Sequence, residues 1–360
     1  MHTAPADPEA IDVSSQWQQA AGAVLAATGV VLVVGGPDSG KSTFCRYVLE
    51  QAMLRRQALA FLDADLGQSQ VGPPTTLGVK LYPSHAADDL GLSADAVYFI
   101  GQTSPLGRFL EVVMGLQRLV AAVRRRRRLI LVNTSGYVSG PGAVRLKTAK
   151  AEVLAPQIGI LLSRQEELGS LLTPLSLLCK QTYLLSTSPQ ARLKSWEERR
   201  RHRQLRFAAV FAKARIQSFP LGRSGWLGFP WVQGVPLAPP EQDRLQEIAG
   251  TIVWRAERGG GWVYVVVAEP LTEAAHTEMV AQVAPDRLFW VPWAHLESRL
   301  VGLLDKDMLT LALGILQAPN WQGGEIAILT PLPPRWVPRV RFLRLGRLRL
   351  DAAGQELPPL

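Results

Sequence analysis

A short glycine-rich run followed by lysine and serine is the part of this sequence best suited to chemistry. Gly35, Gly40, Lys41 and Ser42 fill the pattern G-x-x-x-x-G-K-[ST]. In this pattern the glycines let successive backbone N–H groups point at a phosphate, and the helix that follows adds its positive end. The lysine reaches the β- and γ-phosphates, and the serine hydroxyl is placed to hold Mg²⁺. The predicted nucleotide ligands are Gly35, Pro37, Asp38, Ser39, Gly40, Lys41, Ser42 and Thr43.

Two carboxylates follow the next apolar run. Asp63 and Asp65 lie two residues apart at the end of a predicted strand, so their side chains point the same way. A carboxylate beside a phosphate-binding loop can hold the Mg²⁺ shell or accept a proton from an attacking hydroxyl. One acid can therefore orient metal-bound waters while the other faces the nucleophile. The residues alone leave open which acid does which.

Two further groups of residues fit the same chemistry. Residues 133–137, Asn-Thr-Ser-Gly-Tyr, end another predicted strand and bring hydroxyl groups to the same edge. A basic segment, residues 190–214, is predicted to form one long helix, on which Arg199 and Arg203 share a face. Arginines that a helix brings over a γ-phosphate stabilise the charge of phosphoryl transfer. A solvated charge run is the alternative interpretation of that helix.

These residues need a scaffold that gathers strand ends. From residue 30 onward, nearly continuous apolar runs alternate with helical patterns, which predicts an α/β fold. We expect a parallel sheet with helices on both faces, of the P-loop NTPase type, and ligands beyond the carboxyl ends of its strands. The expected strands are 30–34, 58–63, 97–100, 129–133, 158–162 and 183–185, and the expected helices are 42–56, 105–127, 142–154 and 165–172.

The composition changes after about residue 219. Eight of the ten tryptophans lie beyond Gly225, and short β-type runs occur at 262–267, 288–290, 325–329 and 340–350. We predict an N-terminal arm at 1–28, a P-loop domain at 29–219 with a lid helix at about 190–214, and a smaller, mostly β domain at 220–360. The tryptophans favour a packed core, although aromatic and arginine side chains together can also bind single strands.

Composition bounds the remaining possibilities. The chain of 360 residues is 47% hydrophobic and 19% charged, which is typical of a globular protein. We expect no membrane association, because no apolar run reaches the roughly 18 residues of a span. The two cysteines, far apart, favour an intracellular, cytoplasmic location without a zinc site or disulfides. The net charge of +9 favours polyanionic partners such as RNA or DNA.

Taken together, four motifs resemble those of the polynucleotide 5′-hydroxyl kinases. They are Gly-Pro-Asp-Ser-Gly-Lys-Ser-Thr, Asp-Ala-Asp-Leu-Gly-Gln-Ser, Gly-Gln-Thr-Ser-Pro at 101–105 and Asn-Thr-Ser-Gly-Tyr. The family includes the kinase subunit of the mRNA 3′-end cleavage and tRNA-splicing machinery and relatives in ribosomal RNA processing. The basic helix is similar to the family's lid, whose R-x-x-x-R motif matches Arg199 to Arg203. The resemblance covers roughly residues 30–219, and the N-terminal β domain of the eukaryotic members is missing.

The resemblance implies an enzyme, a phosphotransferase that moves the γ-phosphate of ATP or another nucleoside triphosphate to the 5′-OH of RNA or DNA, with Mg²⁺. Lys41, Arg199 and Arg203 would be catalytic, and Asp65 would be the base. Ser42, Asp63 and Gln68 would form the metal and phosphate shell, and the substrate would contact Gln102, Thr134, Gly136 and Tyr137. Tyr137 departs from the family's T-x-G-W motif, which has tryptophan there.

Three other functions remain open at this point. A P-loop GTPase or ATPase switch would share the loop, but the sequence has no N-K-x-D motif to recognise guanine. A non-catalytic nucleic-acid-binding assembly factor could retain ATP as a structural ligand and use the basic, tryptophan-rich C-terminal region. A small-molecule kinase is a further alternative, because the loop does not identify the acceptor. The sequence names no protein partner.

Overall fold

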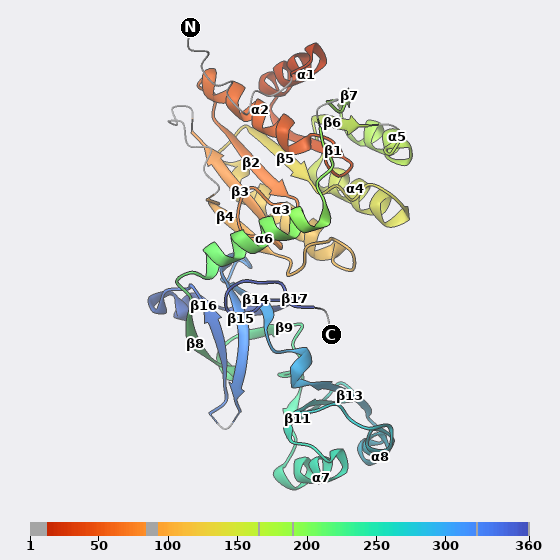
Figure 1. Ribbon diagram of the computed structural model, residues 1–360, viewed down its shortest axis with the longest axis vertical. Coiled ribbons are helices and arrows are strands. Elements are labelled where there is room, and N and C mark those ends of the chain that lie inside the picture. The colour runs from red at the N-terminus through yellow and green to blue at the C-terminus, as the bar shows by residue number, and fades with distance from the viewer. Residues whose placement is uncertain (1–12, 84–92, 165, 189–190, 322, 359–360) are drawn as a thin grey trace. The chain divides into compact units, whose positions relative to one another are not determined.

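The computed structural model describes residues 13–83, 93–164, 166–188, 191–321 and 323–358 (Figure 1). The chain divides into two compact units, residues 1–203 and 204–360. The division falls within the helix α6 (Trp196–Phe211). The predicted domain bounds of 29–219 and 220–360 stay a prediction. No helix among the described residues is both long and apolar enough to span a bilayer.

The first unit is built on a seven-stranded sheet with the order β4-β3-β2-β5-β1-β6-β7. All six predicted strands are confirmed. One strand, β3, was not predicted, and it alone of the described strands runs against the others, so the sheet is mixed. The strands are β1 (Gly29–Gly35), β2 (Leu59–Ala64), β3 (Thr76–Tyr82), β4 (Ala96–Phe99), β5 (Leu129–Thr134), β6 (Ile158–Ser163) and β7 (Gln181–Ser186).

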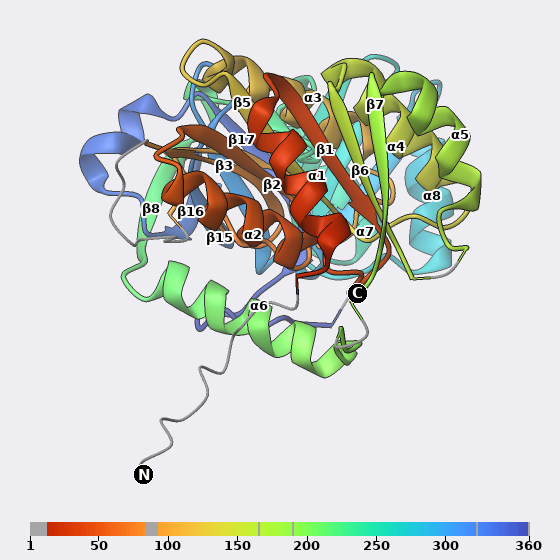
Figure 2. The same ribbon diagram turned by 90° about the horizontal axis from the view of Figure 1, so that it is seen from above.

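Helices cover both faces of this sheet, as predicted (Figure 2). One layer holds α1 (Ser15–Ala26) and α2 (Lys41–Leu54), and the other holds α3 (Phe109–Arg124), α4 (Pro141–Leu154) and α5 (Gly169–Leu178). Three helices begin later than predicted: α3 after a turn at Gly107, whose φ is +71°, α5 at Gly169 and α6 at Trp196. The predicted N-terminal arm contains α1, and its residues 1–12 lie outside the described residues.

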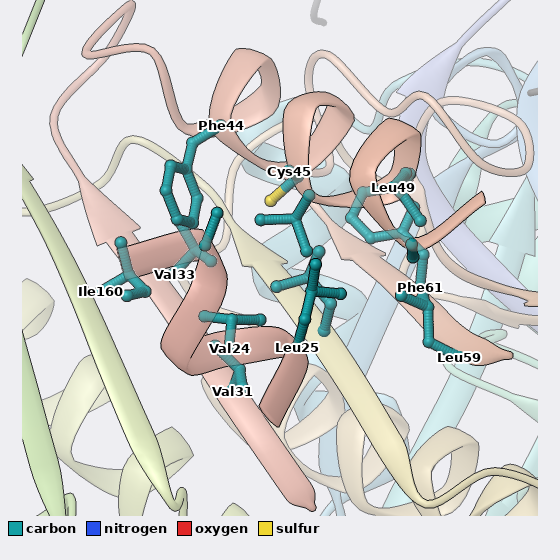
Figure 3. Packing of buried hydrophobic residues seen from close by; sticks show 14 of the residues in the cluster. Val24, Leu25, Val31, Val33, Phe44, Cys45, Leu49, Leu59, Phe61 and Ile160 are labelled. Atoms are coloured by element: carbon teal, nitrogen blue, oxygen red, sulfur yellow. The ribbon is translucent and has the colours of Figure 1, made fainter. Parts of the chain in front are cut away.

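The core between α1, α2 and the sheet explains why the strands are so apolar (Figure 3). Val31 and Val33 of β1 pack between Val24 of α1 and Phe44 of α2, and all four are fully buried. Each such side chain contributes about 1.5–3 kcal/mol by leaving water. Trp17 of α1 meets Phe44 edge to face, with ring centroids 5.3 Å apart. This packing fixes the start of α2, where the phosphate-binding loop ends.

The second unit is mostly β, as predicted, and contains two sheets. A six-stranded sheet has the order β8-β16-β15-β14-β17-β9, and a four-stranded sheet has the order β10-β11-β12-β13. The predicted runs at 262–267, 288–290, 325–329 and 340–350 correspond to β12, β13, β16 and β17. The elements are β8 (Arg215–Pro220), β9 (Gly225–Leu227), β10 (Val235–Pro236), α7 (Pro239–Ala249), β11 (Val253–Gly259), β12 (Trp262–Val267), α8 (Glu273–Val283), β13 (Arg287–Pro292), β14 (Arg299–Leu304), β15 (Thr310–Asn320), β16 (Glu325–Thr330) and β17 (Phe342–Arg349).

Most tryptophans of this unit form one aromatic core. Trp231 is fully buried, and its ring lies 5.8 Å from Trp226, 6.2 Å from Trp293 and 5.4 Å from Trp321. Aromatic pairs at these distances add stability beyond the area they bury. The preference for a packed core over a binding surface is therefore right for these four residues.

Candidate active site

A cavity of about 730 Å³ in the first unit collects residues from several strand ends. Its walls come from the segments that follow β1, β2 and β5, together with residues 103–105 and the beginning of α6. The prediction that ligands bind beyond the carboxyl ends of the strands therefore matches the position of this cavity. The predicted site residues that line it are Pro37, Asp38, Ser39, Gly40, Lys41, Ser42, Thr43, Asp65, Gln68, Gly136, Tyr137, Arg199 and Arg203.

The phosphate-binding loop has the backbone that its glycines allow. Gly40 has a φ of +89° and precedes the first residue of α2, so a side chain there would be strained. A Cβ at Gly35 would lie 2.4 Å from the Ser39 hydroxyl, which is closer than atoms can approach. The Lys41 ammonium donates to the carbonyl of Gly36 at 2.5 Å. Burial lowers the pKa of Lys41, and the charges of Asp65 and Asp38 oppose that shift.

Asp63 is fully buried and organises the strand ends. Its Oδ1 accepts hydrogen bonds from the Asp65 N–H and the Asn133 Nδ2, each at 3.1 Å, and its Oδ2 accepts one from the Gln70 N–H. Burial, with the charge of Asp65, raises the pKa of Asp63 to about 6, although the three hydrogen bonds favour its ionised form. Asp63 does not line the cavity. Its hydrogen bonds to the Asp65 and Gln70 N–H groups instead hold the loop after β2 in place.

Asp65 is the carboxylate that reaches the cavity. Its Oδ1 accepts from the backbone N–H groups of Gly67 and Gln68, each at 3.1 Å. Among the described residues, Asp65 Oδ2 has no hydrogen-bond partner, so one carboxylate oxygen is available to a ligand. The backbone therefore fixes Asp65 through Oδ1, while Oδ2 is available to react with a ligand.

The residues around Ser42 fit a hydrated Mg²⁺ ion. Asn133 Nδ2 lies 3.5 Å from the Ser42 hydroxyl, and Asn133 Oδ1 is a buried acceptor without a partner among the described residues. A metal-bound water would satisfy that oxygen. Nowhere in the described part of the chain do three His, Cys, Asp or Glu side chains gather as a metal site. This donor set suits Mg²⁺, which keeps several waters and takes few protein ligands.

The first turns of α6 contact the phosphate-binding loop. Arg199 forms an ion pair of 2.5 Å with Asp38, and the same carboxylate accepts the backbone N–H of Lys194 at 2.8 Å. Gln68 donates from Nε2 to the Arg199 carbonyl at 3.3 Å, which ties the helix to the acidic loop. Arg203 is 7% exposed and lines the cavity one turn further on. This part of α6 therefore carries both arginines to the cavity.

The segment after β5 approaches the phosphate-binding loop closely. A Cβ at Gly136 would lie 2.8 Å from the Pro37 backbone, so only glycine fits there. Thr134 is fully buried and does not line the cavity, because its hydroxyl donates to the Val33 carbonyl at 2.8 Å. Gln102 also lies outside the cavity wall and braces its own loop, donating to the carbonyls of Ser104 and Leu106.

Two buried lysines behind the cavity were not predicted. Lys147 of α4 donates to the Thr134 hydroxyl at 2.9 Å and to the Ser135 carbonyl at 2.6 Å. Lys150 is 1% exposed, and its ammonium has no partner among the described residues. Burial lowers the pKa of both, for Lys150 to about 8. The sequence held a signal: both lysines share the helix face of Ala143, Leu146 and Leu154, which is otherwise apolar.

The fold and this site define a P-loop nucleotide-binding protein. Comparisons with known proteins show to which family of P-loop proteins the chain is similar. A profile of the family described as "mRNA cleavage and polyadenylation factor CLP1 P-loop" matches residues 35–213. A polyribonucleotide 5′-hydroxyl-kinase of Pyrococcus furiosus is 30% identical over 91% of this chain and 89% of its own length. A homologue of the same name from Methanocaldococcus jannaschii is 27% identical over 91% and 88%.

A eukaryotic relative and a solved structure agree with this result. The Clp1 polyribonucleotide 5′-hydroxyl-kinase of Xenopus laevis is 32% identical over 53% of this chain and 45% of its own length. The structure of a Clp1p–Pcf11p complex has a similar fold, with a TM-score of 0.60 at 11% identity, covering 95% of this chain and 80% of that one. The chain belongs to the CLP1 P-loop family of polyribonucleotide 5′-hydroxyl-kinases.

Proposed function

We propose that the protein is an ATP-dependent polynucleotide kinase that phosphorylates the 5′-hydroxyl end of RNA. One observation carries the proposal: the cavity that holds the phosphate-binding Lys41 also holds the Asp65 carboxylate with one oxygen unengaged. A nucleotide switch needs no base for an organic hydroxyl, whereas a kinase does. The names of the relatives support RNA as the acceptor, and DNA remains a second acceptor to test.

The proposed mechanism assigns each residue one task. Asp65 accepts the proton of the 5′-OH while the oxygen of that hydroxyl forms a bond to the γ-phosphorus. The bond between the γ-phosphorus and the oxygen that bridges the β- and γ-phosphates breaks, and the nucleoside diphosphate leaves. Lys41, Arg199 and Arg203 stabilise the charge on the transferred phosphoryl group and on the leaving diphosphate. For this step, Arg199 leaves its ion pair with Asp38 and turns toward the phosphate. The positions of Arg199 and Arg203 on one helix let a single movement deliver both charges.

Mg²⁺ would neutralise phosphate charge when bound, held by the Ser42 hydroxyl and through waters by Asn133 and Asp63. Gln68 serves this shell by fixing the acidic loop against α6. The backbone of residues 35–43 holds the triphosphate of ATP or another nucleoside triphosphate. Gly136 and Tyr137 contact the acceptor end. We assign Thr134 and Gln102 an indirect role in place of the predicted contact with the substrate. Both side chains hydrogen-bond to backbone carbonyls and so hold the loops that line the cavity.

Transfer of labelled γ-phosphate to a 5′-OH oligoribonucleotide tests the proposal. Wild-type protein should label the acceptor, and Lys41→Ala should abolish labelling, whereas Lys180→Ala, a lysine exposed on the same unit, should not. Asp65→Asn should reduce turnover far more than ATP binding. The proposal fails if wild-type protein labels no RNA or DNA, or if nucleotide hydrolysis without acceptor exceeds transfer with it. Equal loss of turnover and binding in Asp65→Asn would remove Asp65 from the role of base.

A further inference from the structure

The helices α7 and α8 lie beside the four-stranded sheet of the second unit (Figure 1) and pack on one of its faces. In that contact, Val263, Val265 and Met279 are fully buried. The pairing of β12 with β13 sets Trp262 beside Arg287 and Tyr264 beside Phe289. Because side chains alternate along a strand, these four residues lie on the face opposite the helices. At the other end of these strands the same face turns Val266 and Val291 toward the aromatic core, whereas Trp262, Tyr264 and Phe289 lie outside that core.

Three of these residues form a continuous group, which we call the aromatic row: Trp262, Tyr264 and Phe289. The ring centroids of Trp262 and Tyr264 are 6.4 Å apart with planes 30° from parallel, and those of Tyr264 and Phe289 are 5.9 Å apart. Phe289 is 44% exposed, and the other two are half-buried. None of the three belongs to the buried clusters of this unit. The row therefore adds little to the core and presents ring surface to solvent.

Arg287 places a positive charge beside the row. The Arg287 guanidinium lies 5.6 Å from the centre of the Trp262 ring, and no described carboxylate pairs with it. Within strands β11 to β13, this face carries one acidic side chain, Glu257, which is 1% exposed and forms an ion pair with Arg255. A ligand on the row would thus meet aromatic rings and an unpaired cation, with no exposed carboxylate from these strands.

We propose that the aromatic row and Arg287 bind single-stranded RNA, with bases stacked on the rings and a phosphate held by Arg287. Stacking platforms on open sheets bind single strands in this way, because every base has a π-face and every nucleotide a negative charge. The site is distinct from the kinase cavity, since all its residues belong to the second unit. It would not discriminate strongly among bases, because stacking on a ring is possible for each of them.

Binding of a fluorescein-labelled, 12-nucleotide RNA with a 5′-phosphate tests this site in the full chain. The 5′-phosphate prevents phosphorylation, so anisotropy reports binding alone. Trp262→Leu and Phe289→Leu should each weaken binding about 5- to 100-fold, from the loss of one stacked base. Tyr264→Phe keeps the ring and should bind like wild type, as should Ile252→Ala, which removes an exposed aliphatic side chain of the same unit. Arg287→Ala should weaken binding and reduce its salt dependence.

Two further measurements test whether RNA binds at the aromatic row or elsewhere on the protein. Ultraviolet crosslinking of the same RNA to wild-type protein should label the peptides of residues 260–267 or 287–292, a result that requires no variant to fold. Duplex RNA should bind more weakly than single-stranded RNA, because its bases are already stacked. Unchanged affinity in both leucine variants, or crosslinks confined to the first unit, would overturn the proposal, as would dimer formation by wild type that Phe289→Leu abolishes. Labelling of a dinucleotide acceptor reports separately on the proposed kinase function.

Discussion

Replacing Lys150 with methionine should stabilise the first unit at neutral pH. The Lys150 ammonium is 1% exposed and has no hydrogen-bond partner among the described residues. Methionine has a similar length and shape but no charge, so the substitution keeps the packing of α4 and removes the cost of burying an ion. Burial lowers the pKa of Lys150 from 10.5 to about 8.

The size and sign of the effect follow from that pKa. A decrease of roughly 2.5 pH units corresponds to about 3 kcal/mol, because one unit is 1.36 kcal/mol. Below pH 8 the lysine is protonated in both the folded and the unfolded chain, so the whole cost is present. Between pH 8 and 10.5 the unfolded chain binds more protons than the folded one, and the stability of wild type rises with pH. The advantage of Lys150→Met should therefore be about 3 kcal/mol at pH 7 and shrink toward zero by pH 10.5.

Urea unfolding followed by circular dichroism at 222 nm suits this test, because most of the described helical residues, those of α1 to α5, belong to the first unit, while α7 and α8 belong to the second. Wild type and Lys150→Met are compared at pH 7 and at pH 10, so that contributions of the other ionisable groups largely cancel in the difference. A variant that is less stable than wild type at pH 7, or whose advantage is the same at both pH values, would refute the reasoning.

Three further perturbations separate structural from catalytic roles. Lys147→Met should lower kcat about tenfold or more, because the Ser135 carbonyl beside the cavity loses its hydrogen-bond donor. For the same reason it should stabilise the protein less than Lys150→Met does. An unchanged kcat would contradict this role of Lys147. Asp38→Ala should speed hydrogen exchange at the start of α6 by releasing Arg199, as mass spectrometry can measure, and unchanged exchange would count against the ion pair. Gly136→Ala should lower kcat/KM by about 100-fold while the circular dichroism spectrum is kept, since its Cβ would displace the adjoining Pro37 loop.

Periodicity predicted the elements that bury a continuous apolar surface. All six predicted strands of the first unit exist. In β1, β2, β5 and β6 nearly every residue is buried, and a strand covered on both faces leaves an uninterrupted apolar run. β3 was missed because the glycine and proline residues of Val71-Gly-Pro-Pro before it are typical of a loop. In the second unit the sequence did not predict β8 to β11, β14, β15 or the helices α7 and α8. Gly302 within β14, and Gly314 and Pro319 within β15, interrupt the pattern that identifies a strand. Pairing with each other, and with β16 and β17, fixes these two strands in the sheet.

The sequence predicts a site residue best when a short motif around that residue identifies it. The loop at residues 35–43 needs glycines and a lysine at fixed spacing, so one short stretch identifies it. The depth of a side chain carries no such signal: Asp63 and Asp65 look equivalent in sequence, yet Asp65 lines the cavity and Asp63 is fully buried. The resemblance to the family's T-x-G-W motif placed Thr134 at the substrate, and only the fold shows that its hydroxyl donates to the Val33 carbonyl of β1.

The distribution of buried charge at this sheet edge argues for function over stability. Lys41, Asp63 and Lys147 are each buried with hydrogen bonds that offset part of the lost hydration, whereas Lys150 has none. A chain selected for stability alone would place an apolar residue at position 150. The charge of Lys150 also lowers the pKa of Lys147, so the two lysines are coupled and their effects should not add. An uncompensated cation behind a cavity proposed to hold a triphosphate is the kind of charge that an active site retains despite its cost.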